Sequence, residues 1–144
     1  MKIFTIGFTK KTAEQFFARL KQPGLVRLVD ARLNNVSQLA GFTKMNDLKF
    51  FLREIGKVDY IHLPELAPTQ DILDAYKKNG GDWITYERQF LSLMAARRIE
   101  DKVDKSMIDG GCLLCSKATP EHCHRRLVAE YLREKWDDVE IVHL

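Results

Sequence analysis

The sequence predicts a single α/β domain over residues 1–144, with a mostly parallel sheet of about five strands and helices on both faces. Short apolar runs alternate along the chain with segments in which apolar residues recur at helical spacing. Residues 25–31 form an apolar run broken only by Arg27 and Asp30, as in a strand covered on both faces. A chain of 144 residues can build one core and is too short for two ordinary domains.

Five apolar runs are predicted to be the strands of this sheet. They are residues 2–6, 25–31, 58–63, 112–116 and 139–143. Gly7 closes the first run and Pro64 closes the third, since glycine and proline interrupt regular structure. Strands that alternate with helices in this order predict right-handed parallel crossovers.

Five helices are predicted between and after these strands. They begin at Thr12, Asn46, Thr69, Asp82 and Thr119. Gln15 lies three positions after Thr12 and completes a possible capping box. Pro120 would occupy the first position of the last helix, where proline is favoured. A polar loop is expected over residues 32–44.

Composition and charge narrow the possible functions. The net charge is +3, and lysine and arginine are mixed with acidic residues, which argues against a dedicated nucleic-acid binder. No apolar run approaches the roughly 20 residues that span a bilayer, so we expect no membrane segment. The first residues lack the long apolar core of a signal peptide. Three cysteines, an odd number, fit a reducing compartment, and we expect a cytoplasmic protein.

Residues 110–125 hold all three cysteines and two of the four histidines of the chain. This segment is predicted to run from a strand through a short loop into the start of a helix. Ligands of open α/β sheets bind beyond the carboxyl ends of the strands. The residues expected to meet at that edge are Gly7, Phe8, Thr9, Asp30, Arg32, His62, Glu65, Cys115, Cys123, His124 and Arg125.

Cys115, Cys123 and His124 are the candidate catalytic residues. Amides at a helix N-terminus can stabilise a thiolate, so Cys115 could act as a nucleophile or redox thiol, with Cys123 as the resolving thiol. The seven residues between the cysteines allow a transient disulfide. His124 could serve as a base. The alternative is that Cys115 is a small buried apolar residue and His124 a hydrogen-bonded core residue.

Arg32 and Arg125 are candidate anion-binding residues, because a guanidinium can bind a carboxylate or phosphate through two hydrogen bonds. Asp30 could position Arg32 for this role, or the two could form an ion pair that only orients the loop. Glu65 could be a general acid or base, or a loop charge, and Thr9 is a further candidate substrate contact.

Cys112 and Cys115 resemble half of a metal site, which Cys123 with His122 or His124 could complete. Successive side chains of a strand point to opposite faces, however, so Cys112 and Cys115 cannot share one ion. We therefore predict a packing role for Cys112, and no metal or cofactor.

Four segments of the chain resemble the family called "domain of unknown function 488". They are Thr5-Ile6-Gly7 with Thr9, Val29-Asp30-Ala31-Arg32, residues 60–66, and Leu114-Cys115 followed by residues 120–125. The resemblance runs over essentially the whole chain and implies a single α/β domain without an established activity. It also implies functional roles for Cys115, Cys123, His124, Arg125 and Arg32. Lys117 stands where the family commonly has an acidic residue, so a role requiring a carboxylate there does not carry over.

Two hypotheses follow for the function. The first is a cytoplasmic thiol-dependent enzyme that acts on a small anionic substrate at the carboxyl edge of the sheet. The alternative is a nucleotide or nucleic-acid binding module whose cysteines are structural or hold a metal.

Overall fold

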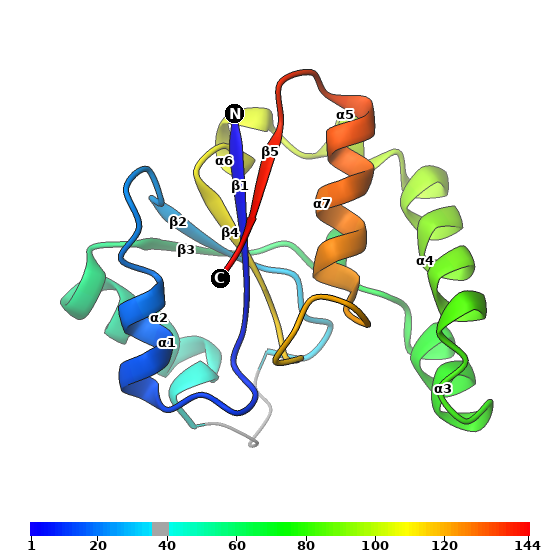
Figure 1. Ribbon diagram of the computed structural model, residues 1–144, viewed down its shortest axis with the longest axis horizontal. Coiled ribbons are helices and arrows are strands. Elements are labelled where there is room, and N and C mark those ends of the chain that lie inside the picture. Colours follow the sequence, from blue (N-terminus) through cyan, green and yellow to red (C-terminus); the bar gives the residue numbers. More distant parts are fainter. Residues whose placement is uncertain (36–40) are drawn as a thin grey trace.

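The structure is a computed structural model that describes residues 1–35 and 41–144 (Figure 1). Its centre is one sheet in which every pairing is parallel and the strand order is β3-β2-β4-β1-β5. The strands are β1 (Lys2–Gly7), β2 (Arg27–Asp30), β3 (Asp59–His62), β4 (Gly111–Cys115) and β5 (Glu140–His143). All five predicted strands are present, so the α/β fold with a parallel sheet is confirmed.

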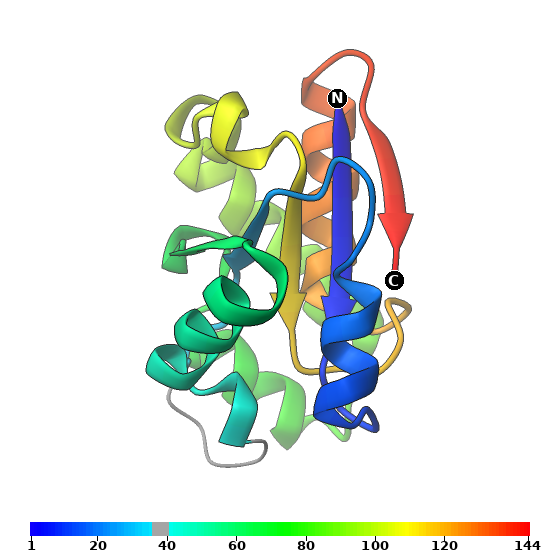
Figure 2. The same cartoon turned by 90° about the vertical axis from the view of Figure 1, so that its left-hand side faces the viewer.

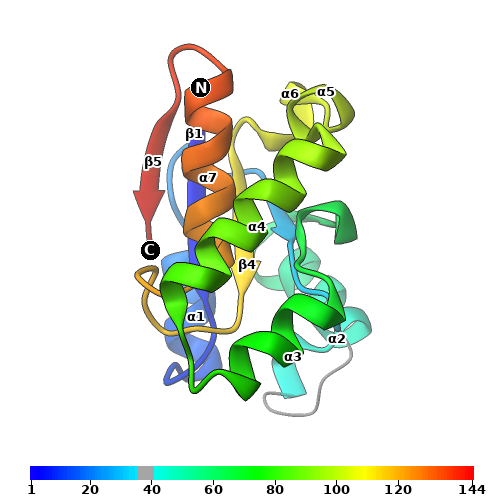
Figure 3. The same cartoon turned by 90° about the vertical axis from the view of Figure 1, so that its right-hand side faces the viewer.

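Helices cover both faces of this sheet. The α-helices are α1 (Ala13–Arg19), α2 (Met45–Phe51), α3 (Gln70–Lys78), α4 (Trp83–Arg97), α5 (Ile99–Lys102), α6 (Lys105–Ile108) and α7 (His124–Lys135). Three short turns of helix are η1 (Gly41–Thr43), η2 (Leu52–Gly56) and η3 (Pro64–Leu66). Figure 2 shows α1 and α2 on one face, and Figure 3 shows α3, α4 and α7 on the other.

The central strand β4 is buried on both faces, which explains its continuous apolar sequence. Leu113 packs into the core under α4 and α7, whereas Cys112 and Leu114 pack into the core under α1 and α2. Cys115 therefore lies on the face opposite to Cys112. The predicted packing role of Cys112 agrees with its complete burial.

The connections that leave the adjacent strands β1 and β4 run in opposite directions across the sheet. After β1 the chain crosses to β2 through α1 on one face, and after β4 it crosses to β5 through α7 on the other. Loops that leave adjacent strands toward opposite faces open a crevice at the carboxyl ends of those strands. This crevice is where the candidate site lies.

Three predicted helix starts are confirmed by hydrogen bonds. The Thr12 side chain accepts from the backbone N–H of Gln15, whose own side chain accepts from the backbone N–H of Thr12. Asp82 and Thr69 also accept backbone hydrogen bonds in the first turns of α4 and α3. These caps satisfy amide groups that have no partner within their helix.

Two predicted helix starts are wrong. Lys44, and not Asn46, precedes α2, and no side chain caps that helix. The last helix begins at His124, with Cys123 as its N-cap, and not at Thr119 and Pro120. Tertiary contacts hold residues 116–123 as a loop: the Thr9 N–H donates to the Ser116 carbonyl at 2.9 Å, and Arg125 holds the Lys117 carbonyl at 2.8 Å.

The chain between β3 and β4 contains the predicted helices α3 and α4. It also contains two short helices, α5 and α6, that the sequence pattern did not indicate. The expected loop over residues 32–44 contains the short helix η1, and its residues 36–40 lie outside the described part of the chain. Over the described ranges, no helix has both the length and the apolar character needed to cross a bilayer.

Candidate functional site

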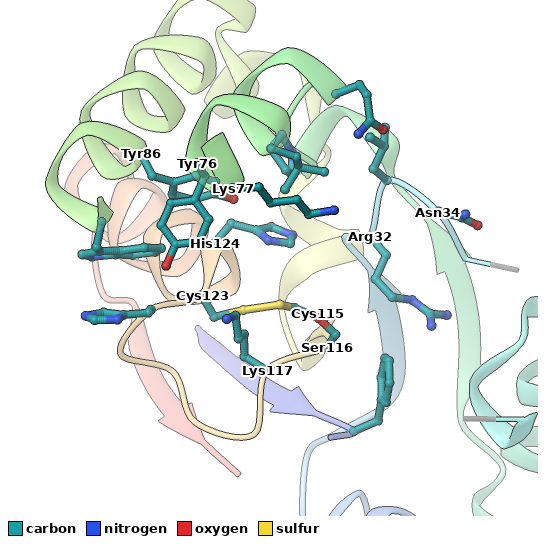
Figure 4. Close-up of a pocket in the computed structure, with 17 residues that line it drawn as sticks. Arg32, Asn34, Tyr76, Lys77, Tyr86, Cys115, Ser116, Lys117, Cys123 and His124 are labelled. Atoms are coloured by element: carbon teal, nitrogen blue, oxygen red, sulfur yellow. A yellow bond between two sulfur atoms is a disulfide. The ribbon is translucent and has the colours of Figure 1, made fainter. Parts of the chain in front are cut away.

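A cavity of about 520 Å³ lies at the carboxyl ends of β1, β2 and β4 (Figure 4). Its walls come from the strand ends, from α3 and α4, and from the start of α7. The side chains that line it include Arg32, Tyr76, Lys77, Trp83, Tyr86, Cys115, Lys117, His122, Cys123 and His124. The position agrees with the place where open α/β sheets bind ligands.

Cys115 and Cys123 form a disulfide in the wall of this cavity (Figure 4). Cys115 is the last residue of β4 and Cys123 is the N-cap of α7, so the strand and the helix bring together sulfurs eight positions apart in the chain. Each residue is only 2% exposed. The pair lies at the positive end of a 12-residue helix, where a thiolate is stabilised after reduction.

His124 is the first residue of α7 and lines the same cavity. Its Nε2 lies 2.8 Å from the carbonyl oxygen of Ala31, next to β2. Burial lowers the pKa of His124 to about 4, and only part of this shift is offset by the bond to Ala31. The ring is therefore neutral at neutral pH. Nε2 carries the proton and donates to Ala31, and Nδ1 is left as an acceptor.

Asp30 and Arg32 form a buried ion pair at the end of β2. Arg32 donates from Nε to one carboxylate oxygen of Asp30 and from Nη2 to the other, both at 2.9 Å. Nη2 also donates to the carbonyl of Thr43 at 2.6 Å. The third nitrogen, Nη1, is buried without a hydrogen-bond partner among the described residues, although Arg32 lines the cavity.

The ion pair has further support from Tyr60 and Asn35, which the sequence did not indicate, and from His62, which it placed at the same edge. The hydroxyl of Tyr60, on β3, donates to Asp30 at 2.5 Å, and Asn35 donates to the Tyr60 oxygen at 3.2 Å. Burial, followed by the bond to Asp30, raises the pKa of Tyr60 above its ordinary value near 10. His62 bonds the backbone carbonyl of Arg32 at 2.8 Å. Tyr60 is the second residue of β3, and β3 pairs with β2, which ends at Asp30. The position of a tyrosine in this neighbouring strand is the signal in the sequence that could have indicated its contact with Asp30.

Arg125 is completely buried beneath the loop of residues 116–123, and it does not line the cavity. Its Nη1 donates to the carbonyl of Lys117 at 2.8 Å, and its Nε donates to the Thr5 hydroxyl at 3.4 Å. A methyl group at Gly7 would collide with the same carbonyl, so the loop and β1 approach as closely as glycine permits. Arg125 therefore positions the loop that carries Lys117.

Thr9 and Glu65 lie away from this cavity. Thr9 is exposed and, with Lys117, lines a separate shallow depression of about 320 Å³. Glu65 is in η3, and its backbone carbonyl accepts a hydrogen bond from Arg97 at 2.7 Å. The structure thus brings Arg32, Cys115, Cys123 and His124 together in one cavity, and places Thr9, Glu65 and Arg125 outside its lining.

Aromatic side chains from α3 and α4 form a second wall of the cavity. Trp83 is stacked between Tyr86 and His122, with ring centroids 5.0 Å from each, and Tyr76 contacts both Trp83 and Tyr86. Burial raises the pKa of Tyr86 above its ordinary value. Tyr86 and Phe90 are buried in the core, whereas Trp83 is only partly buried, and Trp83 and Tyr86 also line the cavity.

The fold and the site together define an α/β protein with a cysteine pair in a cavity at the carboxyl edge of a parallel sheet. The model of the family described as "Domain of unknown function DUF488" matches residues 12–132, and the chain belongs to this family. Comparisons with curated proteins and with solved structures give no match.

Proposed function

We propose that this protein is a thiol-dependent oxidoreductase that acts on a small anionic substrate in the cavity at the ends of β1, β2 and β4. The observation that carries the proposal is the meeting of Cys115 and Cys123 in the cavity wall, which also contains a buried arginine with one unpartnered nitrogen. A cysteine pair supplies the redox group, and the arginine supplies the anion subsite.

The chemistry is a thiol–disulfide exchange in which electrons and protons balance. The reduced pair attacks a small disulfide through one thiolate, forms a mixed disulfide and releases the first substrate thiol. The second cysteine attacks the mixed disulfide and releases the second thiol. The protein loses two electrons and two protons and forms the Cys115–Cys123 disulfide, and a small thiol reductant restores the dithiol in the reverse reaction.

The position of Cys123 makes it the attacking thiolate in this proposal. As the N-cap of α7 it lies nearest to the helix amides, and the cap has no side-chain hydrogen bond. The sequence predicts Cys115 as the nucleophile and Cys123 as the resolving thiol, and the start of α7 at His124 favours the opposite assignment. Cys115, at the rigid end of β4, then closes the disulfide.

In this mechanism the main role of His124 would be to position the sulfurs. Its role as a proton acceptor would be minor. Its lowered pKa makes the imidazole a weak base at neutral pH. Its ring is held by Ala31, and its unprotonated nitrogen can accept a hydrogen bond from a neighbouring thiol. The helix amides then carry most of the thiolate stabilisation.

The anionic part of the substrate would bind at Arg32. The Asp30 carboxylate and Thr43 carbonyl occupy two of its nitrogens and fix the guanidinium plane, which leaves Nη1 for a substrate oxygen. Lys77 and Lys117 also line the cavity and add positive charge near it. A fixed donor loses little conformational entropy when the anion binds.

The test compares an anionic disulfide with a neutral one. Reduced protein is mixed with dithiobis(nitrobenzoic acid), which carries two carboxylates, or with dithiodipyridine, which carries none, and thiol release is followed by absorbance. We expect the anionic disulfide to react faster, two equivalents of thiol per Cys115–Cys123 pair, and the pair to be found oxidised by mass spectrometry.

Matched variants separate the parts of this mechanism. Cys123→Ser is expected to remove the fast phase, and Cys115→Ser to stop the reaction at a mixed disulfide on Cys123. Arg32→Lys, which keeps the charge facing Asp30, is expected to slow the anionic reaction about tenfold, as for one lost charged hydrogen bond, and to leave the neutral reaction unchanged. Equal rates for the two disulfides, or a fast phase that survives both serine variants, would contradict the proposal.

The aromatic wall favours a second candidate function, a nucleotide-binding module. Tyr76, Trp83, Tyr86 and His122 line the same cavity as the cationic side chains of Arg32, Lys77 and Lys117. Titration of the oxidised protein with a nucleoside monophosphate, followed by tryptophan fluorescence, tests this function. A saturable change that is lost in Arg32→Lys supports it, and an unchanged spectrum rejects it.

A further inference from the structure

Three potential metal ligands meet in the wall of the cavity. The Sγ atoms of Cys115 and Cys123 and a ring nitrogen of His124 lie within 4.8 Å of one another, in a search of the described residues. The first cysteine comes from β4, and the other two ligands come from the start of α7. Cys112 is not in this group because it lies on the other face of the sheet.

The donor types suit one borderline-soft divalent ion. Two thiolates and an imidazole are preferred zinc ligands, with bonds of about 2.3 Å to sulfur and about 2.0 Å to nitrogen. A tetrahedral ion would hold donors of those lengths less than about 4 Å apart, a separation that this cluster allows. The Cα atoms of Cys115 and Cys123 are 7.3 Å apart, beyond the usual span of about 4.4–6.8 Å between disulfide-bonded residues, so the backbone leaves room for an ion between the sulfurs.

His124 has the outer contact that a metal-bound histidine commonly has. Its Nε2 donates to the backbone carbonyl of Ala31 at 2.8 Å, which fixes the ring and its tautomer. The remaining nitrogen, Nδ1, is then the one that can bind an ion. This contact comes from Ala31, the residue after β2, and does not depend on the cysteines, so it is an independent indication of a ligand position.

The fourth position of such an ion would open into the cavity. All three ligands line the cavity wall. Three protein ligands with one open position are typical of catalytic zinc sites, whereas structural sites close the shell with four protein ligands. Two thiolates also neutralise the charge of a divalent ion, so the nearby Arg32 does not oppose its binding.

We propose that the reduced protein binds one zinc ion through Cys115, Cys123 and His124, and that the Cys115–Cys123 disulfide excludes it. The two states exclude each other because zinc binds thiolates, and the sulfurs of a disulfide carry no thiolate charge and are poor ligands. A small thiol reductant converts the disulfide, with two electrons and two protons, into two thiols. The ion then replaces the two protons. This site goes beyond the proposed oxidoreductase function.

The test uses cobalt(II) as a spectroscopic substitute for zinc. The same wild-type protein is prepared oxidised and, under inert gas, fully reduced, and each form is titrated with cobalt(II). We expect the reduced form to bind one equivalent, with intense tetrahedral ligand-field bands and a sulfur-to-cobalt charge-transfer band, and zinc to bleach both. The oxidised form is expected to show neither band. No variant is needed for this comparison, so misfolding cannot account for the result.

Variants then assign the ligands, each checked for folding by circular dichroism. Cys115→Ser and Cys123→Ser are expected to remove the charge-transfer band or weaken binding at least about 100-fold, and His124→Gln to weaken it about 10- to 100-fold. Cys112→Ala and His122→Gln remove a thiol and an imidazole outside the group, and they should leave binding unchanged.

The two proposals fail in different ways. No bands from reduced wild-type protein, or equal losses in Cys112→Ala and Cys115→Ser, would overturn the metal site and leave the disulfide-exchange kinetics untouched. Cobalt binding without any preference for the anionic disulfide would support the metal site alone.

Discussion

The two buried arginines Arg32 and Arg125 are both predicted from the sequence to bind an anion, but they have different surroundings in the structure. Arg32 follows β2 and is 6% exposed, and Arg125 is the second residue of α7 and is fully buried. Each has one guanidinium nitrogen without a hydrogen-bond partner among the described residues. Arg32 faces the carboxylate of Asp30, whereas the ion pairs of the described residues include none with Arg125.

The difference separates ligand binding from positioning. Asp30 compensates the charge of Arg32. The Arg32 side chain lines the cavity, and its Nη1 is the donor that has no partner among the described residues. Among the described residues, Arg125 has only neutral oxygens as hydrogen-bond partners. Burial lowers its pKa to about 10, so it still carries its charge at neutral pH. A buried arginine without a carboxylate is costly, and its bond to the Lys117 carbonyl fixes the loop that joins the two cysteines.

The largest effect is expected from Asp30→Asn, which keeps the shape of the side chain and leaves the Arg32 charge uncompensated. Because breaking a buried ion pair strands the other charge, we expect the free energy of unfolding to fall by about 3 kcal/mol. Urea denaturation measures this change. Asp59→Asn is the control: Asp59 is exposed and pairs with Arg27 at 3.6 Å, so the loss should be under about 1 kcal/mol. Similar losses in both variants would contradict this account of Arg32.

Arg125→Ala tests the other arginine. It removes a large buried side chain and leaves the Lys117 carbonyl without its donor, and we expect a loss of about 2 kcal/mol in the free energy of unfolding. Because the loop of residues 116–123 loses its anchor, its backbone amides should also exchange hydrogen faster than those of α7. Arg133→Ala, which removes an exposed arginine further along α7, should change neither property by much. Unchanged exchange in Arg125→Ala would show that the arginine does not hold the loop.

Gly7→Ala displaces the same loop without removing Arg125. The new Cβ would overlap the Lys117 carbonyl, so the loop must shift, and overpacking of this kind costs about 1–2 kcal/mol. Thermal unfolding measures the loss, and hydrogen exchange should locate the shift in residues 116–123. Gly41→Ala, where no atom of the described residues lies within 4 Å of the added methyl group, should change stability by less than about 0.5 kcal/mol. Full stability in Gly7→Ala would mean that the loop is not held against β1.

The smallest effect is expected from Tyr60→Phe, in the surroundings of Arg32. Removal of the hydroxyl that donates to Asp30 should cost about 1 kcal/mol at pH 8. The folded protein raises the pKa of Tyr60, so this contribution is complete below about pH 10 and declines as the pH rises through the folded value. The difference between wild type and variant, measured by urea denaturation at several pH values, should therefore narrow above about pH 10. A constant difference would contradict the contact.

The sequence predicted the order and type of the secondary structure because local patterns determine them. A short apolar run between turns, such as residues 112–116, is typical of a buried strand. Thr12 and Gln15, three positions apart, form a capping box. Alternation along β4 also placed Cys112 and Cys115 on opposite faces. The match to the family model, over residues 12–132, confirms the resemblance that these motifs indicated.

Local patterns failed where a distant group changed the outcome. Thr119 and Pro120 form a good helix start by themselves, but the Arg125 side chain and the Thr9 amide hold the preceding residues as a loop. The start of α7 consequently moves to His124, and Cys123 becomes its N-cap. The support of Asp30 by Tyr60 joins residues 30 positions apart, and no local pattern reports such a contact.

The sequence by itself determined the parallel α/β fold and the strand-end positions of Asp30, Arg32 and Cys115. It also determined that Cys112 cannot share a site with Cys115. These follow from periodicity and from the rule that parallel strands end at one edge. The sequence also placed Cys115, Cys123 and His124 at one edge, but only the tertiary structure decided that their donor atoms lie within 4.8 Å of one another, and that Arg32 lines the cavity while Arg125 supports the loop. The physical reason is that side-chain direction and burial depend on packing between elements distant in the chain, which the spacing of residues does not encode.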